Sequence, residues 1–261
     1  MKISIITVVL NDKENIEKTI QSVLSQNTND LEYIIIDGGS TDGTLEIIKK
    51  YKNNVDVIIS EKDNGIGDAF NKGLKNATGD VIGIINSGDW YEANALDVVV
   101  STFMKDNVDI VYGKVQYWKD AHKEYTHSAD HTLLAQFMSM SHPAIFIKKS
   151  IYEKFGFFDE NYKLAMDYEL MLRFYMKRVS FQYVDKVLAN MSLGGTSDVH
   201  WREAYKEAYN IRKKYLGFSY KLYMNYLLQV LKRYVSNLFS AYGLEYLKSY
   251  YRKYFSKIKK V

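Results

Sequence analysis

The chain has 261 residues, 47% of them hydrophobic, which is enough to bury the core of one large domain with an appendage. It contains no cysteine, which excludes a disulfide framework, Cys-ligated zinc and thiol redox chemistry, and fits the cytoplasm. The net charge of +4 is unevenly spread, because residues 217–261 carry nine Lys or Arg against the single acid Glu245.

The first half of the chain alternates short apolar segments with helical patterns. Apolar runs predict buried strands at residues 3–9, 33–36, 55–59 and 81–85. Between them, apolar residues fall on one helical face near 16–24 and 45–51. This alternation predicts a parallel sheet with helices on both faces, which binds ligands outside the carboxyl ends of its strands.

The alternation of apolar runs and helical patterns is looser after residue 89. Helices are predicted near 93–104, 167–177 and 201–215, and strands near 109–117 and 187–192. The region around Pro143 is mixed. We expect the main domain to span residues 1–216 and a basic, aromatic, helical tail to span 217–261.

Two roles of equal weight are open for this tail. Its amphipathic pattern suits packing on the domain, or on a second subunit of a homo-oligomer, and it suits docking on an anionic membrane surface. No stretch reaches the roughly 18 uncharged apolar residues of a membrane span. We therefore expect a cytoplasmic protein, peripheral on the inner face of the cytoplasmic membrane if the tail docks there. No nucleic-acid-binding signature is present in the sequence.

Polar motifs follow the second and third predicted strands. The segment 37–44, DGGSTDGT, is at least a well-formed strand-to-helix turn, and its first Asp is placed to accept a hydrogen bond from a base. The segment 63–68, DNGIGD, lacks the spacing of a dinucleotide loop and of a phosphate loop. The sequence therefore argues against an enzyme that transfers hydride or hydrolyses NTP.

Carboxylates appear at two further places. In the segment 86–90, NSGDW, Asp89 follows the fourth strand and is either a turn residue or a ligand of Mg²⁺ or Mn²⁺. Asp167 and Glu169 open a predicted helix, where they either stabilise its first turn or supply a general base. His142 is a further candidate for the cleft, with packing or a turn as the alternative.

In this order the motifs resemble the inverting glycosyltransferases of family 2. That resemblance implies the GT-A fold, an α/β fold with a mostly parallel central sheet flanked by helices, here with a helical C-terminal extension. Within that family, the motifs are most similar to those of enzymes of bacterial exopolysaccharide, capsule and lipopolysaccharide synthesis. The resemblance runs to about residue 215 and rests on residues 3–7, 37–42, 63–65, 71–73, 79–80, 86–89, 141–142, 166–169 and Arg173.

The resemblance implies a donor site for a nucleotide-sugar, usually a UDP-sugar. Thr7 and Asp37 would line the base pocket, and Asp63 and Asp68 would border the nucleotide and sugar. Asp89 matches the last acid of the DxD-type motif that holds the divalent metal against the diphosphate.

The sequence departs from the family within that motif. Ser87 and Gly88 stand where many members carry acids, which puts the ribose contact and the strength of metal binding in question. One carboxylate with diphosphate oxygens still suffices to hold an ion.

Asp167 matches the catalytic base of the family. Inversion requires an acceptor hydroxyl to attack opposite the leaving diphosphate, and a carboxylate within about 2.6 to 3.2 Å takes its proton. Glu169 is the second choice as base, and Arg173 and His200 are further candidate site residues.

The expected activity is transfer of a hexose or N-acetylhexosamine to a hydroxyl of a glycan or a lipid-linked oligosaccharide. One rival is a nucleotidyltransferase, which should carry a Gly-rich basic first loop that this chain lacks. The other is a non-catalytic relative that binds a nucleotide-sugar or a glycan.

Overall fold

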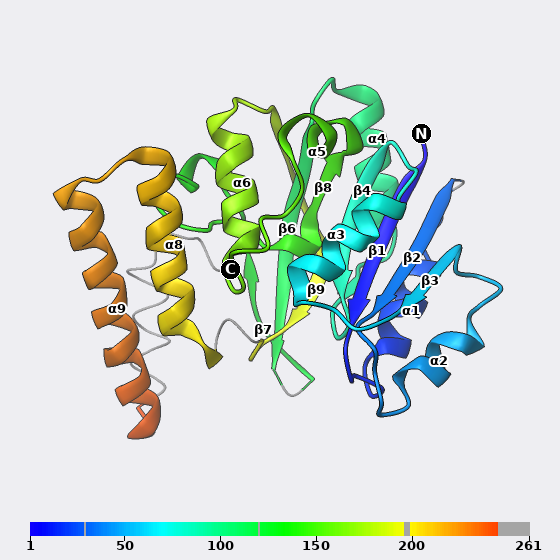
Figure 1. Cartoon of the computed structure of the whole chain (residues 1–261), viewed down its shortest axis with the longest axis horizontal. Helices are drawn as coiled ribbons and strands as arrows, with labels where there is room; N and C mark the ends of the chain where they lie inside the picture. The colour runs from blue at the N-terminus through cyan, green and yellow to red at the C-terminus, as the bar shows by residue number, and fades with distance from the viewer. Residues whose placement is uncertain (29, 120, 196–198, 245–261) are drawn as a thin grey trace.

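The computed structural model describes residues 1–28, 30–119, 121–195 and 199–244 (Figure 1). Within these ranges one sheet of nine strands runs through the molecule in the order β3-β2-β1-β4-β8-β6-β9-β5, and β7 pairs with β6. Helices cover both faces of this sheet (Figure 1). The α/β class expected from the sequence is confirmed.

The N-terminal half is a parallel sheet, as the sequence predicts. Its strands are β1 (Ile3–Val9), β2 (Leu31–Asp37), β3 (Val57–Ser60) and β4 (Val81–Asn86). The connecting helices are α1 (Ile16–Leu24), α2 (Thr44–Lys50) and α3 (Ile66–Asn76). The sequence analysis missed α3. This helix lies so close to β1 that a side chain at Gly73 would overlap Ile6.

The second half extends the sheet with mixed strand directions. Its strands are β5 (Trp90–Tyr91), β6 (Ile110–Lys119), β7 (His122–His127), β8 (Ile145–Lys148) and β9 (Phe181–Ser192). Its helices are α4 (Ala95–Lys105), α5 (Lys149–Phe155) and α6 (Met166–Met176), with short 3-10 turns at His131–Leu133 and His142–Ala144. Strand β8 runs antiparallel to both neighbours, whereas β6 and β9 are parallel.

Two hydrophobic cores lie on opposite faces of the sheet. On one face, Ile6 of β1 and Ile34 of β2 share a core with residues of α3, α6 and α8. On the other, Ile3 and Ile5 of β1 share a core with residues of α1, α2 and α4. Because both faces are covered, the strands are almost continuously apolar, which is the pattern of the sequence.

The chain ends its described part with two helices side by side at one edge of the domain, α8 (Trp201–Leu216) and α9 (Tyr220–Ala241) (Figure 1). Helix α8 is anchored by Glu207, which accepts hydrogen bonds from three backbone amides at residues 163–165 just before α6. Helix α9 contacts α8 through Tyr234, whose ring packs edge-to-face with Trp201 and whose hydroxyl accepts a hydrogen bond from Arg202. In the described part of the chain, no helix combines the length and hydrophobicity needed to cross a membrane.

Candidate active site

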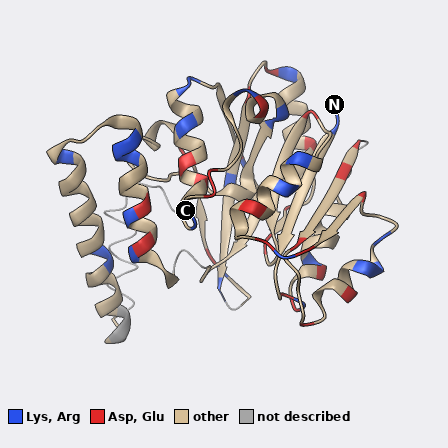
Figure 2. Cartoon of the chain, in the orientation of Figure 1, with Lys and Arg blue, Asp and Glu red and all other residues tan. Residues whose placement is uncertain are grey.

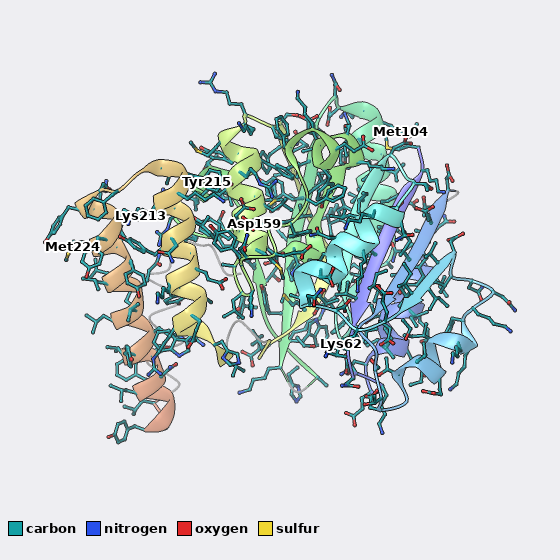
Figure 3. The ribbon with its side chains drawn as sticks, in the orientation of Figure 1. Lys62, Met104, Asp159, Lys213, Tyr215 and Met224 are labelled. Carbon is teal, nitrogen blue, oxygen red and sulfur yellow. The ribbon has the colours of Figure 1, made fainter. Side chains whose placement is uncertain are left out.

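An open cleft of about 880 Å³ lies at the carboxyl ends of the parallel strands. Val8 and Val9 of β1, Asn86 of β4 and the turns that follow β2, β3 and β4 line it, and the end of β9 closes one side. Lys62 lies beside the carboxyl end of β1 (Figure 3) and is part of this lining. The cleft is therefore at the position that the sheet topology predicts, and its size suits a small-molecule ligand.

Asp89 lies on the cleft wall and is nearly buried, with 6% of its surface exposed. Helix α1 fixes the turn that carries it, because the Thr19 hydroxyl donates to the Asp89 carbonyl and accepts from the Gly88 amide. The Ser192 amide donates to Oδ1 of Asp89. Burial raises the pKa of the Asp89 carboxyl to about 8, against this hydrogen bond.

His142 lies between Asp89 and Asp167. Its Nδ1 is 3.5 Å from Oδ2 of Asp167, and its Nε2 is 4.0 Å from Oδ2 of Asp89. The three residues come from the turn after β4, from the 3-10 turn before β8 and from the first turn of α6. The fold thus brings together three residues that are far apart in the sequence and that the sequence analysis proposed separately.

Burial shifts the pKa values of His142 and Asp167 in opposite directions. It raises the pKa of Asp167, an effect that the neighbouring imidazole reduces. It lowers the pKa of His142, against the influence of the Asp167 carboxylate. Both residues border a small cavity lined mostly by apolar side chains, among them Phe70 and Met171. The Asp167 side chain keeps 28% of its surface exposed, although its Oδ1 is buried.

Glu169 and Arg173, by contrast, hold the fold together. The Glu169 side chain is 1% exposed, pairs with Arg173 at 2.9 Å and accepts a hydrogen bond from Tyr215 of α8, which lies against α6 (Figure 3). Arg173 also donates to the carbonyls of Phe155 and Phe157. With its oxygens engaged in these bonds, the Glu169 carboxylate is not placed to serve as the base.

Asp63 and Asp68 surround Lys72 of α3. The Lys72 amine lies 2.8 Å from Asp63, 3.4 Å from Asp68 and 2.9 Å from Glu61, and these carboxylates raise its pKa although burial opposes the shift. Asp63 lines the cleft. Asp68 lies behind it in the first turn of α3, where it accepts a hydrogen bond from the Asn64 amide.

Thr7 and Asp37 lie inside the protein and do not line the cleft. Thr7 is fully buried, and its hydroxyl is hydrogen-bonded to the Tyr33 hydroxyl at 3.0 Å. Asp37 is also fully buried and accepts hydrogen bonds from the Ser40 amide and the Ser60 hydroxyl, so it holds the turn after β2. Val8 and Val9, the next two residues and the last two of β1, line the cleft instead.

Ser87 and Gly88 line the cleft, and so does Asp12, which the sequence analysis did not propose. Asp12 lies in the loop between β1 and α1 and accepts a hydrogen bond of 2.6 Å from the Ser87 hydroxyl. No sequence signal marks this pairing, because it joins residues 75 positions apart.

The loop after β9 completes one side of the cleft. Gly194 and Gly195 line it, whereas Thr196 and Ser197, which complete the flap expected from the sequence, lie outside the described residues. His200 is exposed at the N-terminal end of α8 and is not part of the cleft lining.

The residues present fit a divalent cation that shares its coordination with a ligand. Across the described ranges, no cluster of three or more His, Asp or Glu side chains is arranged to hold an ion alone. Asp89 nevertheless offers a buried carboxylate to the cleft, and the amide oxygen of Asn86 is buried there with no hydrogen-bond partner among the described residues. Oxygen ligands of this kind suit Mg²⁺ and Mn²⁺ when phosphate oxygens complete the shell.

Comparison with known families gives a match over most of the domain. Residues 4–175 match the family model described as glycosyl transferase family 2. A cholesterol galactosyltransferase of Borreliella burgdorferi is 36% identical over 112 residues, which cover 42% of this chain and 31% of that protein. A PGL/p-HBAD biosynthesis glycosyltransferase of Mycobacterium bovis is 29% identical over 75% of this chain and 78% of its own length.

Solved glycosyltransferases share the fold. TarS 1-349 of S. aureus in complex with UDP-GlcNAc superposes with a TM-score of 0.66 at 19% identity, over 81% of this chain and 65% of that one. The mannosyltransferase PcManGT from Pyrobaculum calidifontis, in complex with GDP-Man and Mn²⁺, gives 0.65 at 16% identity, over 84% and 65% of the two chains. At this identity the likeness concerns the fold alone.

Proposed function

Since the chain belongs to glycosyl transferase family 2 and is a glycosyltransferase, we propose that it inverts the anomeric carbon of a UDP-sugar, with Asp167 as the base. The observation that carries this proposal is the placement of Asp89 and Asp167 on opposite edges of the His142 ring, at 4.0 and 3.5 Å. A carboxylate on the proposed donor side and one on the proposed base side thus lie on either side of the same imidazole.

Asp167 is suited to take the proton of an acceptor hydroxyl. Its burial raises its pKa, which makes the carboxylate a stronger base than an exposed Asp, and its Oδ1 has no hydrogen-bond partner among the described residues. The His142 Nδ1 lies 3.5 Å from Oδ2, so we propose that the unpartnered Oδ1 receives the proton once the acceptor is bound. Glu169 is committed to Arg173 and Tyr215, which leaves Asp167 as the base we propose.

Asp89 would hold a divalent metal, Mn²⁺ or Mg²⁺, against the donor diphosphate. When bound, such an ion offsets the negative charge that develops on the leaving phosphate oxygens. The Thr19 hydroxyl holds the backbone carbonyl of Asp89, and the Ser192 amide donates to its carboxylate, before the donor arrives. The complex of PcManGT with GDP-Man and Mn²⁺ lends support to a metal in this fold.

We assign the donor as a UDP-linked hexose or N-acetylhexosamine and the acceptor as a hydroxyl of a glycan or of a lipid-linked oligosaccharide in surface polysaccharide synthesis. The UDP-GlcNAc complex of TarS supports the donor class. The relatives are a cholesterol galactosyltransferase and a PGL/p-HBAD biosynthesis enzyme, and the first name includes a lipid acceptor. Because the chain spans 31% of the first relative, we use that name only as support for the acceptor class.

The helical tail suits this acceptor. We place its start at residue 217, where Gly217 ends α8 with φ 77°, a conformation that favours glycine. Helix α9 carries Lys and Arg but neither Asp nor Glu (Figure 2). Six of its exposed apolar side chains form a stripe that we call the α9 stripe: Tyr220, Leu227, Leu228, Leu231, Val235 and Leu238. A basic helix with such a stripe suits an anionic membrane surface, where a lipid-linked acceptor would lie.

Nucleotide release from a panel of UDP-, GDP-, dTDP- and CMP-sugars, with Mn²⁺ and with a chelator, tests the proposed donor. We expect slow release of UDP from one UDP-sugar, which the chelator and Asp89→Ala both abolish. Release from a different nucleotide-sugar would overturn the UDP assignment. Undiminished release in the chelator would overturn the proposed requirement for a divalent metal.

A further inference from the structure

The Asp12 carboxylate is fixed at the edge of the donor cleft. Its Oδ1 accepts a hydrogen bond from the Asn15 side-chain amide at 2.7 Å, and its Oδ2 accepts one from the Ser87 hydroxyl at 2.6 Å. All three residues line the cleft. The loop after β1 and the turn after β4 thus meet at one acidic point, on the same turn as Asp89.

Gly88 explains why an acid comes from the first loop. Its φ is +91°, a conformation that L side chains rarely adopt, so an acid at this position would be strained. A side-chain carbon built at Gly88 would lie 3.7 Å from Oδ2 of Asp12. The Asp12 carboxylate therefore lies within reach of the space into which an acid at position 88 would extend.

We propose that Asp12 supplies the carboxylate that the turn after β4 lacks, and that with Asp89 it binds the divalent cation of the donor complex. This inference rests on the proposed function. Because the Ser87 hydroxyl donates its hydrogen bond to Asp12, the Ser87 oxygen presents only lone pairs to the cleft.

These groups form a set of oxygen donors in one part of the cleft. Two carboxylates, the Ser87 hydroxyl and the buried amide oxygen of Asn86 all line it. Such a set repels a bare diphosphate but attracts Mg²⁺ or Mn²⁺, which bridge carboxylates to phosphate oxygens.

The alternative is that Asp12 only fastens the loop after β1 to the turn after β4. In that case its hydrogen bond would matter and its charge would not.

A charge-neutral variant separates these two readings. In Asp12→Asn the amide oxygen still accepts the Ser87 hydroxyl, and the Asn15 amide can turn its oxygen toward the new NH2 group, but the negative charge is lost. The exchange variant Asp12→Ser/Ser87→Asp places the carboxylate on the other side of the same hydrogen bond. Asp42→Asn is the matched control, since Asp42 also fixes a loop at this end of the sheet by accepting hydrogen bonds from Thr44 and Lys13.

UDP affinity is measured by calorimetry with Mn²⁺ and with EDTA, and bound Mn²⁺ by electron paramagnetic resonance. The Mn²⁺-dependent gain in UDP affinity should fall about tenfold in Asp12→Asn, the loss of one charge-assisted contact. It should persist in Asp42→Asn and return in the exchange variant. An unchanged gain in Asp12→Asn would overturn the inference, as would an exchange variant that recovers the melting temperature without the gain.

The wild-type protein separates this inference from the proposed function. If it shows no Mn²⁺-dependent gain for UDP, the proposed donor and metal fail, and Asp12 fails with them. If the wild-type gain is present and Asp12→Asn keeps it, the inference about Asp12 fails while the proposed function stands.

Discussion

His142 links Asp89 to Asp167, because its Nε2 lies 4.0 Å from the first carboxylate and its Nδ1 lies 3.5 Å from the second. The imidazole lowers the pKa of Asp167, whose burial raises it. We regard His142 as a positioning residue for the proposed base, one that opposes the rise in the pKa of Asp167.

Replacing His142 with Gln should therefore move the acidic limb of the pH profile of kcat to higher pH. A base works when it is deprotonated, so each unit by which the pKa of Asp167 rises costs about tenfold in rate on that limb. The loss should be larger near pH 6 than near pH 8. His131→Gln serves as the control, since His131 is a partly buried histidine outside the site that stacks on Phe181. A uniform loss at all pH values would contradict the positioning role.

Asp89 should make the metal-free protein less stable as the pH rises. Its pKa in the folded protein is about 8, above the ordinary value of 3.8, so the unfolded chain releases this proton first. Stability is therefore lost between about pH 4 and pH 8. In EDTA, Asp89→Asn should melt a few degrees higher than wild type at about pH 8 and show a smaller gain at about pH 5. Equal shifts at the two pH values would show that the buried charge is not the cause.

Glu32 should act in the opposite direction and stabilise the fold above acidic pH. Burial alone would raise its pKa, but hydrogen bonds from Lys2, Ser4 and Thr78 lower it to about 2, from 4.5. Its contribution is full above about pH 4.5 and is lost as the pH falls to about 2. Glu32→Gln should cost about 1 to 3 kcal/mol in urea unfolding at neutral pH. The exposed Glu46→Gln is the control, and a cost that is the same at acidic pH would refute the account.

Introducing a charge into the α9 stripe should weaken binding to anionic vesicles. Leu231 is 59% exposed within the stripe, whereas Asn225 is exposed on the polar side of the same helix. In flotation with phosphatidylglycerol vesicles, Leu231→Glu should bind several-fold more weakly than Asn225→Glu, which makes the same change of charge. Equal binding by both variants would point to charge alone, and no binding by the wild type would end the membrane proposal.

The sequence predicted the buried parallel half of the sheet well, because continuous apolar strands and amphipathic helices carry their own signal. It missed α3, whose buried face includes Gly67, Asn71 and Gly73 beside apolar residues. Short strands such as β8 and β7 also escaped, since their direction and pairing depend on partners far away in the chain.

For the site, the motifs marked the correct edge of the sheet but not every side chain. Thr7 was placed in the base pocket from family resemblance, whereas in the structure it is fully buried and the next two residues, Val8 and Val9, line the cleft. His142 and Asp167 were both named in advance, but their contact depends on how α6 packs on the sheet. Asp12 was not found because its partner Ser87 is brought close by tertiary structure alone.

The account depends most directly on Asp167, and the comparison to make is UDP release from the donor sugar by wild type and by Asp167→Asn. Asn has nearly the same shape but cannot take a proton, so turnover should fall by about 100-fold or more while UDP affinity stays within about twofold. That combination would place the loss in the chemical step. Turnover close to the wild-type value, with the variant folded and UDP bound, would show that Asp167 is not the base.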